Sequence, residues 1–207
     1  MNKKACLLLF LSVFLLINIV YAGKDPVTLL PFDRGSKSNP KDAENLKKVP
    51  LRSQNDPRNG VIGASACGPT ALGMAFEYFG KNIPTDQLIK ESGMTVEEGS
   101  SIYSINKLAN KYFPNSHFSY ATVFLKDPLV YLKEQIDSGG LVIVPIAGRY
   151  SNKTAPEGHY LLVTDYNNGR VYANDPLDGT RVDISENHFL SLWTSKVKPK
   201  PCVVIKK

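Results

Sequence analysis

The amino-acid sequence predicts an α+β protein in which N-terminal helices pack on a C-terminal antiparallel sheet. Three observations predict this class. Apolar residues recur at helical spacing between residues 71 and 137, whereas apolar, β-branched runs dominate from Leu141 onward. The turn Asn167–Gly169 joins two of these runs into a hairpin. The chain of 207 residues is long enough for one domain with its own core.

Residues 1–22 have the composition of a signal peptide. Lys3 and Lys4 precede an apolar run from Ala5 to Val20, and Ala22 ends a small-residue cleavage site. The alternative is a membrane anchor, but the run is short for a membrane span and no charged stop-transfer segment follows it. We therefore expect cleavage after Ala22, a secreted or periplasmic protein, and no stable membrane insertion afterwards.

Residues 23–49 are rich in polar residues and proline, so we expect an extended N-terminal arm before a domain that comprises residues 50–207. The chain has a net charge of +6, and several lysines lie in Lys196–Lys207. We interpret this charge as a solvated basic end, with weak attraction to an anionic cell surface as the alternative. No basic helix is interleaved with aromatic residues, which argues against a nucleic-acid partner.

The first half of the domain contains the helix signals. The first helix follows Cys67, has Pro69 in its first turn, and is expected to stop at Gly80 because glycine favours a helix C-terminus. Loop composition precedes it at Pro57–Ser65. Further helices are expected at Thr85–Glu91, Ser100–Tyr112 and Pro128–Asp137.

The second half contains the strand signals, with the loop Gly148–Glu157 between the first two strands. Alternating or continuous apolar runs bounded by Gly, Pro and Asn predict these strands. They are expected at Leu141–Ile146, Gly158–Tyr166, Arg170–Asp175, Thr180–Ile184 and Pro201–Ile205, with a short helix at Glu186–Trp193.

Cys67 is the candidate nucleophile because it lies at the start of an apolar helix. Free amide hydrogens and the positive end of the helix dipole favour the thiolate, which is the reactive form of cysteine. One alternative is a small side chain packed under a turn. Another is a disulfide with Cys202, although Cys202 lies in the final strand and is expected to be a buried, inert thiol. The spacing of the two cysteines fits no zinc site, and we expect no metal or cofactor.

His159 is the candidate base for this cysteine, since histidine titrates near neutral pH. It precedes a strongly apolar strand that would hold its backbone rigidly at the edge of a cleft. His117 and His188 lie in polar surroundings, so we interpret them as surface residues. The hairpin would bring Asp175 beside His159, where a carboxylate can orient the imidazole. Asn174 is the alternative, because neighbouring strand residues point to opposite faces.

Gln54 is the candidate for a further role. Attack of a thiolate on an acyl group produces an oxyanion, and a side-chain amide can donate to it together with the backbone N–H of Cys67. The sequence contains no glycine-rich phosphate loop with a following lysine and hydroxyl residue. We therefore do not expect a nucleotide-driven transport step in this chain.

Four segments together resemble the papain-like cysteine peptidases of the bacteriocin-processing, double-glycine leader peptidase type, in the stand-alone branch without a transporter. They are Ser53-Gln54-Asn55-Asp56, Ala66-Cys67-Gly68-Pro69-Thr70-Ala71-Leu72, Gly158-His159-Tyr160 and Asn174-Asp175-Pro176. The resemblance implies a papain-like fold with Cys67 as nucleophile, His159 as general base and acid, Asp175 as orienter and Gln54 as oxyanion donor. The chain departs from the family in the longer segment between Gln54 and Cys67.

The sequence therefore predicts an exported cysteine peptidase that acts on a peptide or protein through a Cys67, His159 and Asp175 triad. A second hypothesis is a catalytically silent domain that binds a peptide or a cell-wall fragment in the same groove. A third retains the thiol chemistry but acts as an amidase or transpeptidase on peptidoglycan, because one fold can host several of these activities.

Overall fold

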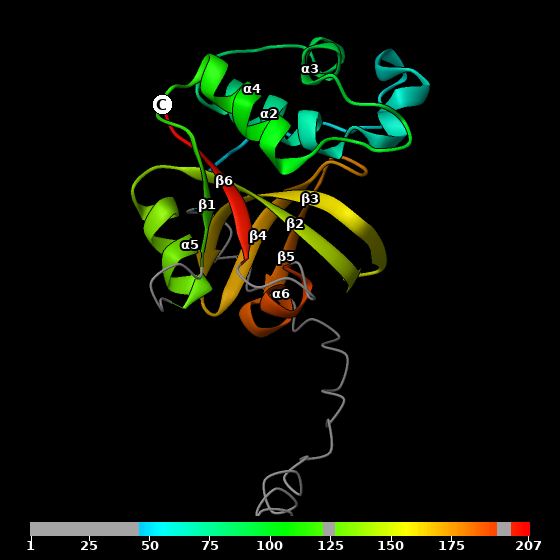
Figure 1. Cartoon of the computed structure of the whole chain (residues 1–207). Helices are drawn as coiled ribbons and strands as arrows, with labels where there is room; N and C mark the ends of the chain where they lie inside the picture. Colours follow the sequence, from blue (N-terminus) through cyan, green and yellow to red (C-terminus); the bar gives the residue numbers. More distant parts are fainter. Residues whose placement is uncertain (1–45, 122–126, 194–199) are drawn as a thin grey trace, which may run out of the picture. The chain divides into compact units, whose positions relative to one another are not determined.

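A six-stranded antiparallel sheet lies at the centre of the protein, in the strand order β1-β6-β2-β3-β4-β5 (Figure 1). The computed structural model describes residues 46–121, 127–193 and 200–207. These residues all belong to one compact unit. The strands are β1 (His117–Tyr120), β2 (Leu141–Tyr150), β3 (Lys153–Asn167), β4 (Arg170–Asp175), β5 (Thr180–Ser185) and β6 (Pro201–Ile205). The antiparallel sheet expected for the C-terminal half is confirmed.

Helices lie on both sides of this sheet (Figure 1). The helical elements are η2 (Pro57–Asn59), η3 (Val61–Ser65), α2 (Cys67–Tyr78), α3 (Thr85–Ser92), α4 (Ile102–Tyr112), α5 (Pro128–Asp137) and α6 (Glu186–Leu192). One apolar cluster joins α2, α3 and α4 to one face of the sheet, and a second joins α5 and α6 to the other face. The packing of the N-terminal helices on the sheet is therefore as predicted, with two later helices on the opposite face.

The sequence of strand β2 is continuously apolar rather than alternating because both faces of the strand are buried. Leu141 and Ile143 belong to the cluster under α2 and α4, whereas Val142, Val144 and Ile146 belong to the cluster under α5 and α6. A central strand that is buried on both faces needs apolar residues at every position.

Helix α2 begins at Cys67, earlier than the apolar periodicity alone indicates. The backbone N–H and the side-chain hydroxyl of Thr70 both donate to the Ala66 carbonyl oxygen, which closes the first turn. At the other end, Gly80 has a φ of +93°, and Lys81 N–H donates to Phe76 O. This is the Schellman arrangement, in which glycine tolerates the left-handed conformation that ends a helix.

Two expectations for loops were wrong. Residues 148–150 and 153–157 continue β2 and β3 as a paired hairpin, and Tyr150 lies directly opposite Lys153. A register shift between Ile146 and Gly148 interrupts the alternation that would have indicated a longer strand. His117 was expected in a loop but begins the edge strand β1, which contains four residues. Such short strands carry too little sequence pattern to be recognised.

The described chain begins within the segment that was expected to be an extended arm. Leu46 and Val49 are buried, and the Lys47 N–H donates to the Asp165 carboxylate. The predicted signal peptide, residues 1–22, and residues 23–45 of the arm lie outside the described residues. Among the residues that are described, no helix is both long and apolar enough to cross a membrane.

Candidate active site

Cys67 is the first residue of α2, and its side chain is partly exposed. Its Sγ lies 4.0 Å from the carbonyl oxygen of Gly158, the residue that precedes His159 in β3. The packing of α2 against β3 therefore brings the two candidate residues together from segments about ninety positions apart. Both Cys67 and Cys202 have free thiols.

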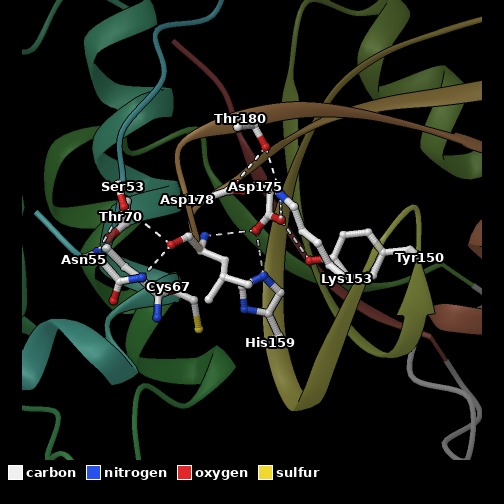
Figure 2. A network of polar contacts seen from close by, with 12 residues as sticks. Ser53, Asn55, Cys67, Thr70, Tyr150, Lys153, His159, Asp175, Asp178 and Thr180 are labelled. Carbon is white, nitrogen blue, oxygen red and sulfur yellow. Dashed lines mark hydrogen bonds and ion pairs between the residues drawn. The ribbon is translucent and has the colours of Figure 1, made fainter.

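His159 is 3% exposed, so its ring is enclosed by the protein. Its Nε2 lies 2.9 Å from Asp175 Oδ1. The other ring nitrogen lies on the side of the Cys67 sulfur, with which the imidazole also interacts (Figure 2). The imidazole thus lies between a thiol and a carboxylate, an arrangement in which the carboxylate orients the ring and the ring can exchange a proton with the thiol.

The Asp175 carboxylate is fully buried and accepts four hydrogen bonds (Figure 2). Oδ1 accepts from His159 Nε2 and from the backbone N–H of Leu177, each at 2.9 Å. Oδ2 accepts from the hydroxyl of Tyr150 and from Lys153 Nζ, also at 2.9 Å each. A carboxylate held at both oxygens cannot rotate away from the imidazole.

Electrostatics at this site favour a charged histidine. Burial alone would lower the pKa of His159, but hydrogen bonds to Asp175 and Cys67 outweigh burial and raise that pKa to about 9. Burial alone would raise the pKa of Asp175, but the hydrogen bonds from His159, Leu177 and Lys153 hold it well below its usual value. An imidazolium beside a carboxylate is therefore the stable state near neutral pH.

Gln54 is buried beside the turn that leads to Cys67. Its side-chain nitrogen donates to the Ala64 carbonyl at 2.7 Å, and its backbone N–H donates to Pro176 O at 2.7 Å. Its side-chain oxygen has no hydrogen-bond partner among the described residues. Gly63 permits this arrangement, because a Cβ at that position would lie 2.5 Å from the Gln54 carbonyl oxygen. The amide nitrogen carries a second N–H that the bond to Ala64 does not use.

The remaining candidates lie elsewhere. Asn174 points away from His159 and donates to the carbonyl oxygens of Val49 and Pro50, so Asp175 is the residue beside the imidazole. Cys202 is buried in β6, where burial raises the pKa of its thiol to about 12. His117 and His188 interact with Asn115 and with Arg149, respectively, rather than with the cysteine.

Tyr150 and Lys153 escaped the sequence interpretation because they fall in the stretch expected to be a loop. A polar pair, Ser151 and Asn152, separates them, and Ser151 has a φ of +52°. A short polar turn between possible strand residues is the signal that could have indicated the hairpin. Nothing in the sequence pattern indicates that this hairpin reaches Asp175.

Comparison with known proteins assigns the chain to a family. The model of the Peptidase_C39-like family matches residues 46–200, which include the four segments described above. The chain belongs to the Peptidase_C39-like family. A C39-like peptidase is a cysteine-type peptidase, and the α+β architecture is the papain-like fold of this family. A search of curated proteins gave no match.

Solved structures have the same fold as this C39-like peptidase. A protein from Bacillus anthracis described as a C39-like peptidase is 18% identical, with a TM-score of 0.58 over 78% of this chain and 96% of that chain. The peptidase domain of Streptococcus ComA, a bifunctional ABC transporter in quorum sensing, is 21% identical, with a TM-score of 0.54 over 77% and 99%. A double-glycine motif protease from an AMS/PCAT transporter, solved with its leader peptide, is 20% identical, with a TM-score of 0.52 over 78% and 93%.

Proposed function

We propose that this C39-like peptidase hydrolyses peptide bonds through Cys67, His159 and Asp175. The observation that carries the proposal is the position of the His159 ring, between the Cys67 sulfur and a carboxylate that is hydrogen-bonded at both oxygens. A silent binding domain would have no need of this alignment. The substrate is a peptide or protein segment, as in the related protease solved with its leader peptide.

In the proposed reaction the Cys67 thiolate attacks the carbonyl carbon of the scissile bond. The electron pair of the carbonyl moves to oxygen, where the Cys67 backbone N–H and the unused N–H of Gln54 stabilise the negative charge. His159 then gives its proton to the leaving amine, and a thioester remains on Cys67. Water attacks the thioester carbon while His159 accepts one of its protons, and the C–S bond then breaks to return the Cys67 thiolate. The acid product loses its remaining proton to solvent and leaves as a carboxylate.

We also propose that the protein acts after export. The support is the sequence of residues 1–22, which combines a positive start, an apolar run and a small-residue cleavage site. Sequencing the N-terminus of the mature protein tests this proposal, because a start at Gly23 supports it and retention of Met1 in the cell contradicts it.

Alkylation tests the proposed nucleophile without knowledge of the substrate. In the full chain at pH 7, iodoacetamide is expected to modify Cys67, which is partly exposed and beside an imidazolium. Cys202 is the internal control and is expected to remain unmodified, because it is buried and the pKa of its thiol is about 12. Peptide mapping by mass spectrometry identifies the modified residue. Modification of Cys202 before Cys67 would contradict the proposal.

A library of peptides then tests the reaction itself. The unmodified protein is expected to cleave some members, and the alkylated protein none. Purified peptidoglycan in parallel samples separates the alternatives: new peptide termini support a peptidase, whereas release of muropeptides alone supports the amidase. Binding without cleavage of either material would support the silent domain and overturn the proposed function.

Gln54→Ala tests the oxyanion role. Loss of one donor to a developing oxyanion is expected to lower kcat by roughly 10²- to 10³-fold with little change in KM. Gln87→Ala is the matched control, because Gln87 is exposed on α3 and donates to Glu91 rather than to a residue of the candidate site. If kcat/KM fell by the same factor because KM rose while kcat stayed unchanged, Gln54 would instead be assigned to substrate binding.

A further inference from the structure

The β2–β3 hairpin carries two side chains that meet at one oxygen of Asp175. Tyr150 and Lys153 flank its turn as a directly opposed pair. The Tyr150 hydroxyl and the Lys153 ammonium each lie 2.9 Å from Oδ2, the carboxylate oxygen that His159 does not use (Figure 2). The hairpin therefore holds Asp175 at the oxygen remote from the imidazole.

Lys153 uses its whole hydrogen-bonding capacity within this network. An ammonium group has three N–H donors. Besides Asp175 at 2.9 Å, Lys153 Nζ donates to Asp178 Oδ1 at 2.7 Å and to Thr180 Oγ1 at 2.8 Å. The Lys153 side chain is 16% exposed. A lysine occupied in this way is fixed in position and has no donor left for a substrate.

The charge of Lys153 acts on the imidazole through Asp175. The titratable groups that face His159 or the network on Asp175 are Cys67 from α2, Tyr150 from β2, Lys153 and Tyr160 from β3, Asp175 from β4 and Asp178 from the turn before β5. A carboxylate alone would hold the proton on His159 strongly. Lys153 offsets part of that negative charge, whereas Asp178 offsets part of the charge of Lys153.

We propose that Lys153 is a positioning residue of this active site, which fixes the rotation of the Asp175 carboxylate and sets how firmly His159 holds its proton. The inference rests on the proposed function, in which His159 donates that proton to the leaving amine. An imidazolium that holds its proton too firmly is a poor general acid near neutral pH. The ion pair with Lys153 thus lets Asp175 orient the imidazole without making the imidazolium hold its proton too firmly.

Two substitutions are expected to move the pKa of His159 in opposite directions. Lys153→Met removes a cation from the neighbourhood of the imidazolium, so the pKa of His159 rises by about one unit. Asp178→Asn removes an anion, so the pKa of His159 falls by a smaller amount. NMR titration of the histidine rings in the full chain measures both shifts, and His117 and His188 serve as internal references in the same spectra.

Control variants separate this role from a structural one. Lys153→Arg keeps the charge and is expected to restore the wild-type pKa of His159. Lys90→Met removes an exposed lysine that pairs with Asp86, and it is expected to change nothing at His159. General disruption of the site would move the pKa of His159 in the same direction in Lys153→Met and in Asp178→Asn, and that result would overturn the inference. If Lys153→Met does not fold, an unchanged pKa of His159 in Asp178→Asn overturns it.

The rate of Cys67 alkylation against pH provides the second measurement. The upper inflection of this pH profile follows the loss of the His159 proton, so the inflection is expected to move to higher pH in Lys153→Met. A wild-type Cys67 that does not react would contradict the proposed function itself. A normal reaction with an inflection that is insensitive to Lys153 would contradict only the role of Lys153.

Discussion

Cys67→Ser is expected to abolish peptide hydrolysis and leave the fold intact. A serine hydroxyl holds its proton far more firmly than a thiol, so serine is a much weaker nucleophile beside the same histidine. We expect kcat/KM to fall by about 10³-fold or more. The side chain is partly exposed at the start of α2, so the free energy of unfolding is expected to change by less than about 1 kcal/mol. Peptide cleavage and urea denaturation measure the two quantities.

Cys202→Ala is the matched control for this substitution. Cys202 is completely buried in β6, away from the candidate site, so its loss is expected to lower stability slightly and to leave kcat/KM unchanged. If Cys67→Ser kept a tenth of the wild-type activity, the requirement for the Cys67 thiol as nucleophile would be wrong.

Asp175→Ala is expected to damage both activity and stability. It removes the acceptor for four donors, of which the Tyr150 hydroxyl and the His159 ring are almost completely buried. Removal of one partner from a buried ion pair leaves an uncompensated charge, so the free energy of unfolding is expected to fall by about 3–5 kcal/mol. Loss of the orienting carboxylate is expected to lower kcat/KM by roughly 10²- to 10⁴-fold.

The pH dependence of stability distinguishes Asp175→Asn from the wild type. The pKa of Asp175 is lower in the folded protein than its ordinary value of 3.8. The stabilisation from this carboxylate is therefore complete above that ordinary value and is lost as the pH falls toward the folded value. We expect the melting temperature of the wild type to drop below about pH 4 by more than that of Asp175→Asn. Parallel melting curves from pH 7 to pH 2 would contradict this.

The sequence was sufficient for the parts of the site that depend on local pattern. Helical spacing after Cys67, the apolar run after His159 and the Asn167–Gly169 turn predicted the three elements that carry the candidate triad. The Asn167–Gly169 turn brings the open ends of β3 and β4 together, so it predicted that His159 and Asp175 lie near one another. The choice of Asp175 over Asn174 depends on the register shift between Val163 and Asp165, which the turn does not indicate. The roles of these residues in catalysis stay predictions until the variants are measured.

Other parts of the site depend on contacts that no local pattern encodes. The direction of the Gln54 amide is set by a hydrogen bond to Ala64 and by the backbone contact with Pro176. Lys153 reaches Asp175 from the β2–β3 hairpin, whose register shifts between Ile146 and Gly148. Registers that depend on a bulge are decided by tertiary packing, which a single sequence does not reveal.

The position of β6 has a consequence for how the chain folds. Pro201–Ile205 is the last strand in the sequence, yet it lies between β1 and β2 inside the sheet. Strands β1 and β2 therefore cannot be joined through β6 until Pro201–Ile205 has been synthesised. The pairing of β6 with both strands requires contacts between residues that are far apart in the sequence. Such topologies fold slowly. We expect the candidate site to assemble only after β6 has paired, because α2, which begins at Cys67, packs on the part of the sheet that β6 completes.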